Sequence, residues 1–278
     1  MGFFELNKKM IGGSSYPFGV PFLKNKTFSP KHYDCRVWFS ASMSSVFFDG
    51  NNKVAQWTDI SGYNRHATQS SAAYRPTFTA TGFSGGYPAI NFSGSGLQLK
   101  ITRGFIKDRF SIFAVFSGGN VNSRVIDQRG TGTFGTVKGY QFKNYQSVSG
   151  DIAGVDDGAG NHRGYNVSGL TDSPAMISSV FPENNTLSYY RNGLKYMDVA
   201  SAGGNVPTDI DNTGFDIALG GITSGGTTQD FTGLIAEMIM YNHTLSSVER
   251  KKVEGYLAHK WGLAGNLPVD HPYQTVAP

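Results

Sequence analysis

The feature that most limits the fold of this chain is the spacing of its apolar residues after Arg36. They occur in short continuous or alternating runs separated by Gly, Asn, Ser and Pro, a pattern typical of β-sandwiches and β-barrels. The run FSIFAVF at 110–116 is apolar on both faces, as expected of a strand inside a two-layer core. The stretches 215–221 and 231–242 predict two further strands. The chain is therefore predicted to be all-β.

One turn in this pattern is defined by its chemistry. In YYRNGLKY at 189–196, Asn192 and Gly193 supply the two residues with positive φ that a type I′ turn requires, and strand-forming residues flank them. This stretch predicts an antiparallel hairpin. In contrast, the Gly- and Asn-rich stretch from Asp127 to Ser173 has few apolar runs and is predicted to form variable surface loops.

Composition agrees with one large β domain. The 278 residues exceed the usual ~100–200 residues of a domain, but β-sandwiches often run to ~200–250. Charged residues make up only 16% of the chain, and the single cysteine, Cys35, excludes an intramolecular disulfide. The N-terminus lacks the apolar core of a signal peptide, and no stretch approaches the ~18 apolar residues of a membrane span. We therefore expect synthesis in the cytoplasm without a signal peptide.

A single helix is predicted near 246–261. Ser246 and Glu249 have the spacing of a capping box, and Gly262 lies where a terminal glycine ends a helix. The apolar stripe consists of Val253, Tyr256, Leu257 and Trp261. The charged residues Glu249, Arg250, Lys251, Lys252 and Lys260 are expected to lie mostly outside this stripe. The pattern predicts an amphipathic helix that lies against the sandwich.

Residues 1–35 differ from the rest of the chain. Residues 1–36 contain six Lys or Arg and two Asp or Glu, whereas the remainder carries 18 of each, so the net charge of +4 belongs to this segment. Its prolines and glycines oppose a helix or a central strand. We predict an extended basic-aromatic arm at 1–35 that docks onto a partner, followed by one domain at 36–278. The candidate docking residues are Phe3, Phe4, Lys8, Lys9, Tyr16, Phe18 and Phe22.

Nucleic acid is an unlikely partner for this arm. Six cations without a patterned helix or a stacking platform give only a small electrostatic footprint.

Four stretches of the domain follow known motifs. They are RVWFSAS at 36–42 with VAQWTDISGYNRHATQ at 54–69, YPAINFSGSGLQL at 87–99, LSYYRNG at 187–193, and the segment 231–263 that ends in YLAHKWGL. Together they resemble the concanavalin A-like lectin/glucanase superfamily, specifically the laminin G-like jelly-roll domains of phage and bacterial surface proteins. The resemblance covers 36–273 and implies a two-sheet antiparallel jelly-roll sandwich. Ser40 and Ser93 depart from it, because the family often has Asp there.

Catalysis is not indicated by any motif. The five Glu include no two at the strand spacing that the glucanase branch of the superfamily uses, and Glu237 is interpreted as a structural carboxylate. The pairs Asp156 with Asp157 and Asp209 with Asp211 stay open as catalytic candidates, although paired aspartates in turns usually cap the turn. We therefore predict that the chain is not an enzyme.

Calcium is the one cofactor that the resemblance suggests, because laminin G-like domains often bind it at the rim of the sandwich. In DIAGVDDGAGN at 151–161, Asp156 and Asp157 offer the oxygen ligands that calcium prefers. An ordinary Asp/Gly turn is the alternative. No other metal site or cofactor is predicted, and no carbohydrate-binding residue is assigned.

These observations predict a non-enzymatic structural protein on the surface of a bacteriophage virion, as capsid decoration or associated with the tail. Its arm would dock onto a capsid or tail protein, and its lectin-like domain would face host-surface glycans. A homo-oligomer is expected, because virion proteins usually occupy symmetry axes. Two alternatives stay open. One is a glycan-binding receptor-recognition module of a tail protein, and the other is a glycoside hydrolase or lyase that uses Asp.

Overall fold

The computed structural model describes residues 27–43, 46–118, 123–130, 135–143, 153–165, 174–198, 201–222 and 230–278. The predicted docking residues, from Phe3 to Phe22, lie outside these ranges, so the docking of the arm remains a prediction. Among the described residues, no helix has the length and apolarity to cross a bilayer.

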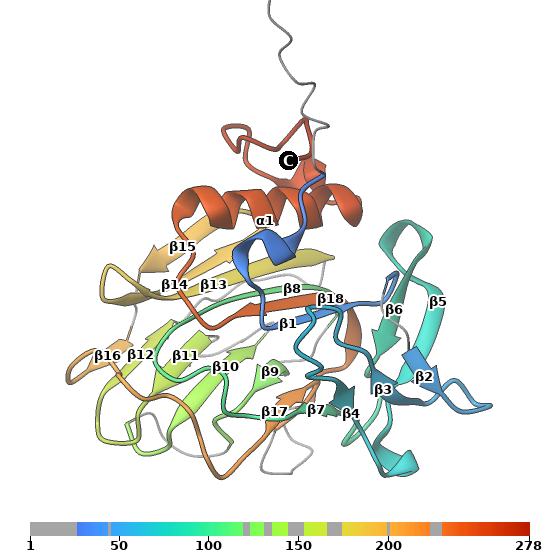
Figure 1. Cartoon of the computed structure of the whole chain (residues 1–278), viewed down its shortest axis with the longest axis horizontal. Helices are drawn as coiled ribbons and strands as arrows, with labels where there is room; N and C mark the ends of the chain where they lie inside the picture. Colours follow the sequence, from blue (N-terminus) through green and yellow to red (C-terminus); the bar gives the residue numbers. More distant parts are fainter. Residues whose placement is uncertain are drawn as a thin grey trace, which may run out of the picture.

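Two antiparallel sheets form the domain, as predicted (Figure 1). The eight-stranded sheet has the order β15 (Leu194–Asp198), β14 (Thr186–Arg191), β13 (Ala175–Glu183), β8 (Phe110–Gly118), β18 (Gly233–Tyr241), β6 (Tyr87–Asn91) and β5 (Thr77–Phe83), and β1 (Val37–Ser40) also pairs with β18. The ten-stranded sheet has the order β16 (Ser201–Gly203), β12 (His162–Tyr165), β11 (Ala153–Asp156), β10 (Gly139–Lys143), β9 (Arg124–Asp127), β17 (Ile217–Leu219), β7 (Leu99–Ile101), β4 (Ala67–Thr68), β3 (Val54–Trp57) and β2 (Val46–Phe48).

Within the described residues, helical structure is confined to short segments and one α-helix. The helix is α1 (Ser247–Lys260), and the 3-10 turns are η1 (Pro30–Tyr33), η2 (Ala72–Tyr74), η3 (Ser84–Gly86) and η4 (Ala264–Asn266). Figure 1 shows α1 lying across the eight-stranded sheet, on the side away from the ten-stranded sheet. This cover explains why β8 is apolar on both faces, since one face meets the core and the other meets the helix side.

The predicted hairpin is confirmed. Asn192 and Gly193 have φ of 49° and 77° and connect β14 to β15, which pair in antiparallel register. The strands predicted at 110–116, 215–221 and 231–242 are β8, β17 and β18.

The stretch from Asp127 to Ser173 was predicted as surface loops, and this is wrong for part of it. It contains β10, β11 and β12. Only one side of these strands is apolar, with Phe142 and Ala153 in the core, while the next positions along each strand are Gln141 and Gly154. Glycines on the non-core side remove the alternating pattern by which short strands are recognised.

Helix α1 begins and ends as predicted. Ser246 Oγ accepts the Glu249 amide, while the Glu249 carboxylate accepts the Ser246 amide at 2.8 Å. At the other end Gly262 has φ of 69°, and the Leu263 amide donates to the Ala258 carbonyl at 2.7 Å. This bond is the 6→1 contact of a Schellman motif.

A buried carboxylate on β18 fixes the position of α1. Glu237 is fully buried, and its Oε1 accepts hydrogen bonds from Trp38 Nε1 at 2.7 Å and from the Tyr256 hydroxyl at 3.3 Å. Its Oε2 accepts from Trp261 Nε1 at 2.6 Å and from the Lys260 ammonium at 2.6 Å. Burial lowers the pKa of Lys260, and the neighbouring Glu237 carboxylate partly offsets this effect. These contacts agree with the structural role predicted for Glu237.

A second buried carboxylate lies further along the helix. Glu254 is fully buried, pairs with Arg250 at 2.6 Å and lies 3.3 Å from His271 Nε2. It also accepts a hydrogen bond from the Ser178 hydroxyl of β13. The expectation that Arg250 lies outside the packed stripe is wrong, because its guanidinium stacks 3.6 Å from the ring centroid of Tyr190 and is only 4% exposed. The docked face of α1 thus combines apolar side chains with paired charges.

The described end of the predicted arm packs onto this helix. Phe28 is 6% exposed, and its ring centroid lies 5.9 Å from that of Tyr256. The Tyr241 hydroxyl donates to the carbonyl of Pro30 at 3.1 Å. Residues 27–33 therefore contact the same side of the sandwich as α1.

Candidate ligand-binding sites

The ten-stranded sheet carries a polar row on its outer face. Residues directly opposite one another in antiparallel strands share a face of the sheet. Successive partners across β2 to β12 are Phe47, Gln56, Thr68, Lys100, Ala218, Asp127, Gln141, Gly154 and Gly164. Five of these nine are polar, and two of the five, Asp127 and Gln141, are buried. The adjacent positions Trp57 and Ala67 are fully buried, and Trp57 stacks on Phe39 of the other sheet at 5.3 Å. The polar row therefore faces away from the core and from α1.

An open groove lies at the β2 end of this row. It has a volume of about 390 Å³ and is lined by Phe47, Ala55, Gln56, Thr68, Gln69, Ser70 and Arg75. We call it the Phe47 groove. Phe47 is 57% exposed, which is unusual for a phenylalanine on a sheet face. Its neighbour Phe48 stacks on Phe78 with ring centroids 5.5 Å apart.

Hydrogen bonds hold the polar side of the Phe47 groove. Arg75 Nε donates to the Gln69 carbonyl at 2.9 Å, and its Nη2 donates to the Ser70 carbonyl at 3.0 Å. Gln69 Nε2 donates to the Gln98 carbonyl at 3.1 Å. Asp49 lies 3.7 Å from Arg75 and offsets its charge. The groove therefore offers an exposed ring beside largely neutral polar groups.

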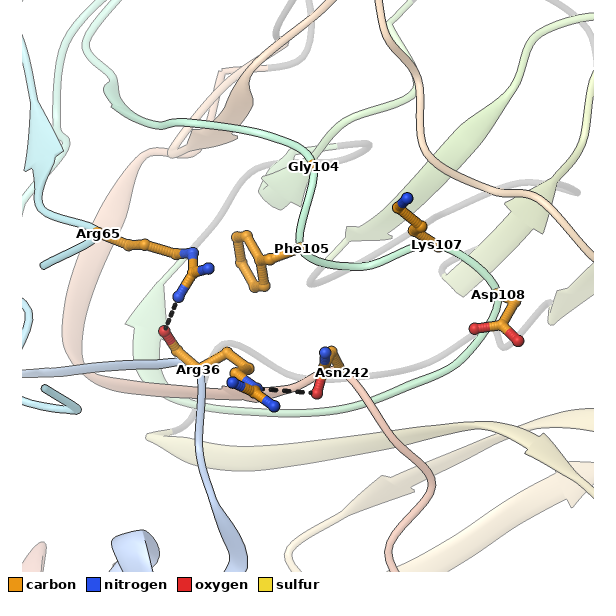
Figure 2. Close-up of a pocket in the computed structure, with 7 residues that line it drawn as sticks. All are labelled: Arg36, Arg65, Gly104, Phe105, Lys107, Asp108 and Asn242. Carbon is orange, nitrogen blue, oxygen red and sulfur yellow. Dashed lines mark hydrogen bonds between the residues drawn. The ribbon is translucent and has the colours of Figure 1, made fainter. Parts of the chain in front are cut away.

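A second pocket lies at one end of the sandwich (Figure 2). It has a volume of about 320 Å³ and is lined by Arg36, Arg65, Gly104, Phe105, Lys107, Asp108 and Asn242. We call it the arginine pocket. Arg36 directly precedes β1 and Asn242 directly follows β18, while 104–108 belong to the connection between β7 and β8. Arg65 comes from the connection between β3 and β4.

The loop that presents Arg65 is organised by Asp59. The carboxylate of Asp59 accepts hydrogen bonds from the amides of Trp38 at 2.9 Å, Ser61 at 2.9 Å and Arg65 at 3.0 Å. This arrangement gives a physical role to the WTDISGYNRH part of the motif at 54–69. It ties the loop between β3 and β4 to the first strand.

The cations of the arginine pocket are held in place. Arg36 Nε donates to Asn242 Oδ1 at 3.1 Å, and Arg36 Nη2 pairs with Asp34 at 2.9 Å. Arg65 Nη1 donates to the Arg36 carbonyl at 3.4 Å, and its Cζ lies 4.9 Å from the ring centroid of Phe105. Both guanidinium groups also lie over the ring of Tyr63, at 4.5 and 5.0 Å.

Tyr63 stands at the edge of this cluster. Its hydroxyl donates to Asp34 at 2.7 Å, and this hydrogen bond raises the pKa of Tyr63. The side chain remains 40% exposed. It is thus an accessible ring whose face carries two cations.

The aspartates considered as calcium or catalytic residues lie elsewhere. Asp156 accepts the Gly158 amide at 2.7 Å, and Asp157 accepts the Ala159 amide at 2.8 Å and Asn161 Nδ2 at 2.7 Å. These contacts are those of an Asp/Gly turn. Within the described part of the chain, no three His, Cys, Asp or Glu side chains come together as a metal site.

The second pair behaves similarly. Asp209 pairs with Lys138 at 2.6 Å, and this contact lowers the pKa of Asp209. Asp211 accepts a hydrogen bond from Gln128 Nε2 at 2.9 Å. None of these four aspartates lines the Phe47 groove or the arginine pocket.

Comparison with known proteins gives a likeness of fold. No protein-family profile and no curated protein sequence matches the chain. Among solved structures, a Trypanosoma rangeli sialidase in complex with 2,3-difluoro-KDN superposes with a TM-score of 0.50 at 14% identity, over 82% of this chain and 33% of the sialidase chain. The binding domain of Paraclostridial Mosquitocidal Protein 1 also has a TM-score of 0.50, at 11% identity, over 82% of this chain and 53% of that chain.

A third structure lies slightly further away. It is domain 4 of AbnA, a GH43 extracellular arabinanase from Geobacillus stearothermophilus in complex with arabinotriose, with a TM-score of 0.48 at 12% identity, over 78% of this chain and 96% of that domain. The chain spans about a third of the sialidase, so the likeness is to a part of that enzyme.

These comparisons contradict the prediction of a non-enzymatic virion structural protein. The two structures above with a TM-score of 0.50 are a sialidase and the binding domain of Paraclostridial Mosquitocidal Protein 1, and neither is a phage particle protein. The prediction failed because one sandwich fold serves many functions, and a basic aromatic arm does not identify its partner. What these matches establish for this chain is the β-sandwich fold.

Proposed function

We propose that the chain is a glycan-binding module of the concanavalin A-like lectin type, without hydrolytic activity of its own. The Phe47 groove is the observation that carries this proposal. A sugar ring has apolar C–H faces and a rim of hydroxyl groups, so it needs an exposed aromatic surface beside hydrogen-bonding groups. Phe47 supplies the first, and Gln56 and Thr68 supply the second. The β-sandwich shared with a sialidase and with the binding domain of Paraclostridial Mosquitocidal Protein 1 supports this proposal at the level of fold alone.

The distribution of carboxylates supports binding in preference to hydrolysis. Glycoside hydrolases use two carboxyl groups about 5–9.5 Å apart on either side of the bond that is cleaved. Among the described residues, no Asp or Glu lines the Phe47 groove, and Asp108 is the one carboxylate that lines the arginine pocket. The fully buried Glu237 and Glu254 are both bound to residues of α1.

The test is a glycan array with the full chain, followed by calorimetric titration of a neutral oligosaccharide that binds. Covering a phenylalanine completely contributes about 1.5–3 kcal/mol, and Phe47 is 57% exposed, so about half of that is available. Phe47→Ala should therefore weaken binding roughly 3- to 12-fold, since each ~1.4 kcal/mol is tenfold. Leu194→Ala is the matched control, because Leu194 is 55% exposed on the hairpin of β14 and β15.

Two results would overturn the proposal. The first is an array on which the folded chain binds no glycan, and the second is equal affinity of Phe47→Ala and the unmodified chain. Release of reducing ends from a bound oligosaccharide would contradict the non-enzymatic part alone.

A further inference from the structure

We propose that the arginine pocket is a second binding site, which recognises an oxyanion: the carboxylate or sulfate group of an acidic saccharide. It lies on different loops from the Phe47 groove and shares no residue with it. The proposal therefore does not depend on the groove. It rests on the charge, the preorganisation and the size of the pocket.

The first argument is charge. Three cations line the pocket, Arg36, Arg65 and Lys107, against the single carboxylate of Asp108. Asp108 is held by the guanidinium of Arg109 at 2.9 and 3.1 Å, so it does little to neutralise the lining. No described carboxylate forms an ion pair with Arg65 or Lys107 within 4.0 Å. An anion entering the pocket would supply the missing partner.

The second argument is preorganisation. Figure 2 shows Arg36 and Arg65 on one side of the opening, Lys107 and Asp108 on the other, and Phe105 between them. Asn242 holds Arg36 at 3.1 Å, and the Phe105 ring supports the Arg65 guanidinium at 4.9 Å. A guanidinium has five N–H donors in a rigid fork that matches a planar or tetrahedral oxyanion. Since the Arg65 guanidinium is already held in one position, less side-chain conformational entropy is lost when an anion binds.

The third argument is size and character. At about 320 Å³ the pocket lies at the lower end of the ~300–1,000 Å³ range of small-molecule sites, which suits one sugar ring and its charged substituent. Phe105 contributes an apolar wall, and the exposed Tyr63 ring lies beside both guanidinium groups. A saccharide with one oxyanion can use the rings and the cations together. A free inorganic anion uses the cations alone.

The experiment is calorimetric titration of the full chain with D-glucuronate, D-glucose 6-sulfate, neutral D-glucose and inorganic sulfate. The two acidic sugars should bind at least about tenfold more tightly than glucose, and rising salt should weaken them, because charge contributes to the affinity. Acidic sugars that bind more tightly than inorganic sulfate support a saccharide ligand. Equal binding of inorganic sulfate overturns the saccharide assignment in favour of a free anion.

Three variants separate specific recognition from general attraction. Arg65→Ala should weaken acidic sugars at least about tenfold, and Arg65→Lys should restore only part of the loss, because it keeps the charge without the fork. Arg103→Ala is the matched control, since Arg103 pairs with Asp216 at 3.4 Å and does not line the pocket. Thermal melts show whether each variant is folded.

Equal losses in Arg65→Ala and Arg103→Ala would overturn the proposal, because attraction would then be diffuse. No difference between acidic and neutral sugars would also overturn it. Phe47→Ala should leave acidic-sugar binding unchanged. If the Phe47 groove binds no glycan, acidic sugars should still bind the arginine pocket, so the two proposals can be refuted separately.

Discussion

The buried carboxylate under α1 allows the sharpest prediction about stability. Glu237→Gln keeps the shape of the side chain but removes its charge. The carboxylate accepts four hydrogen bonds at 2.6–3.3 Å, from two tryptophans, Tyr256 and the Lys260 ammonium. A glutamine has one oxygen to accept with, and its NH2 group would face donors. The variant therefore breaks a buried ion pair and leaves an indole N–H without an acceptor.

The expected loss can be bounded. Removing one partner of a buried ion pair costs about 3–5 kcal/mol. Lys260 is 17% exposed, and its ammonium also donates to the Ser40 hydroxyl at 2.7 Å and to Tyr256 at 3.1 Å, so its charge keeps some compensation. We expect the lower end, about 3 kcal/mol. For a domain of this size each kcal/mol lowers Tm by about 2–4 °C, which gives a decrease of roughly 6–12 °C.

The assay is thermal and urea unfolding followed by circular dichroism, with Glu249→Gln as the matched control. Glu249 takes the same substitution on the same helix but belongs to the exposed capping box, so its loss should stay near 1 kcal/mol. If Glu237→Gln destabilises no more than Glu249→Gln, the view that Glu237 anchors the helix is refuted.

Three further outcomes are expected. Burial raises the pKa of Tyr140 well above 10.0 and that of Cys35 to about 12, so the unfolded chain ionises first as pH rises. The free energy of unfolding should keep its full value below about pH 9 and fall above it by up to about 1.4 kcal/mol per pH unit for each of these two groups. Lys260, whose pKa is lowered, should change the free energy of unfolding in the opposite direction, but it is a single group. An unchanged Tm between about pH 8 and 11 would contradict this expectation. The Cys35 thiol, 1% exposed, should resist alkylation until the chain unfolds, and rapid labelling of the folded protein would argue against its burial. Gly193→Ala should lower the free energy of unfolding by about 1–3 kcal/mol, because φ is 77° and a Cβ would lie 3.1 Å from a neighbouring side chain. Gly265→Ala is the control and should be nearly neutral, because a Cβ there meets nothing within 4 Å. Equal free energies of unfolding for the two variants would refute this reasoning.

The fold was largely predictable because its signals are local. A type I′ turn needs only Asn192 and Gly193, and the capping box needs only Ser246 and Glu249. Arg250 shows the limit of such signals. Its spacing from Val253, Leu257 and Trp261 places it on the packed stripe, whereas its charge predicts exposure. Only the tertiary partners Glu254 and Tyr190 explain how the charge is buried.

The candidate sites could not be predicted in the same way. Arg36, Arg65, Lys107 and Asn242 come from four separated segments, and no spacing along the chain connects them. The short apolar run that contains Phe47 lies between polar residues, so the sequence indicates a short strand there. The 57% exposure of Phe47 depends on the register of β2 on β3, which the sequence does not give. Conversely, Asp156 and Asp157 are adjacent in sequence and suggested a site, yet each accepts an amide of its own turn, and Asp156 Oδ2 also accepts the amide of Gly135.

The packing of both described chain ends against α1 determines how this module can be displayed. Phe28 contacts Tyr256 at one end, and His271 contacts Glu254 at the other. Figure 1 shows the helix over the outer face of the eight-stranded sheet. The Phe47 groove is lined by residues from the outer face of the ten-stranded sheet. A tether, tag or solid support joined at the C-terminus would therefore leave the groove pointing away from the attachment. Immobilisation through this end should preserve ligand access without a spacer.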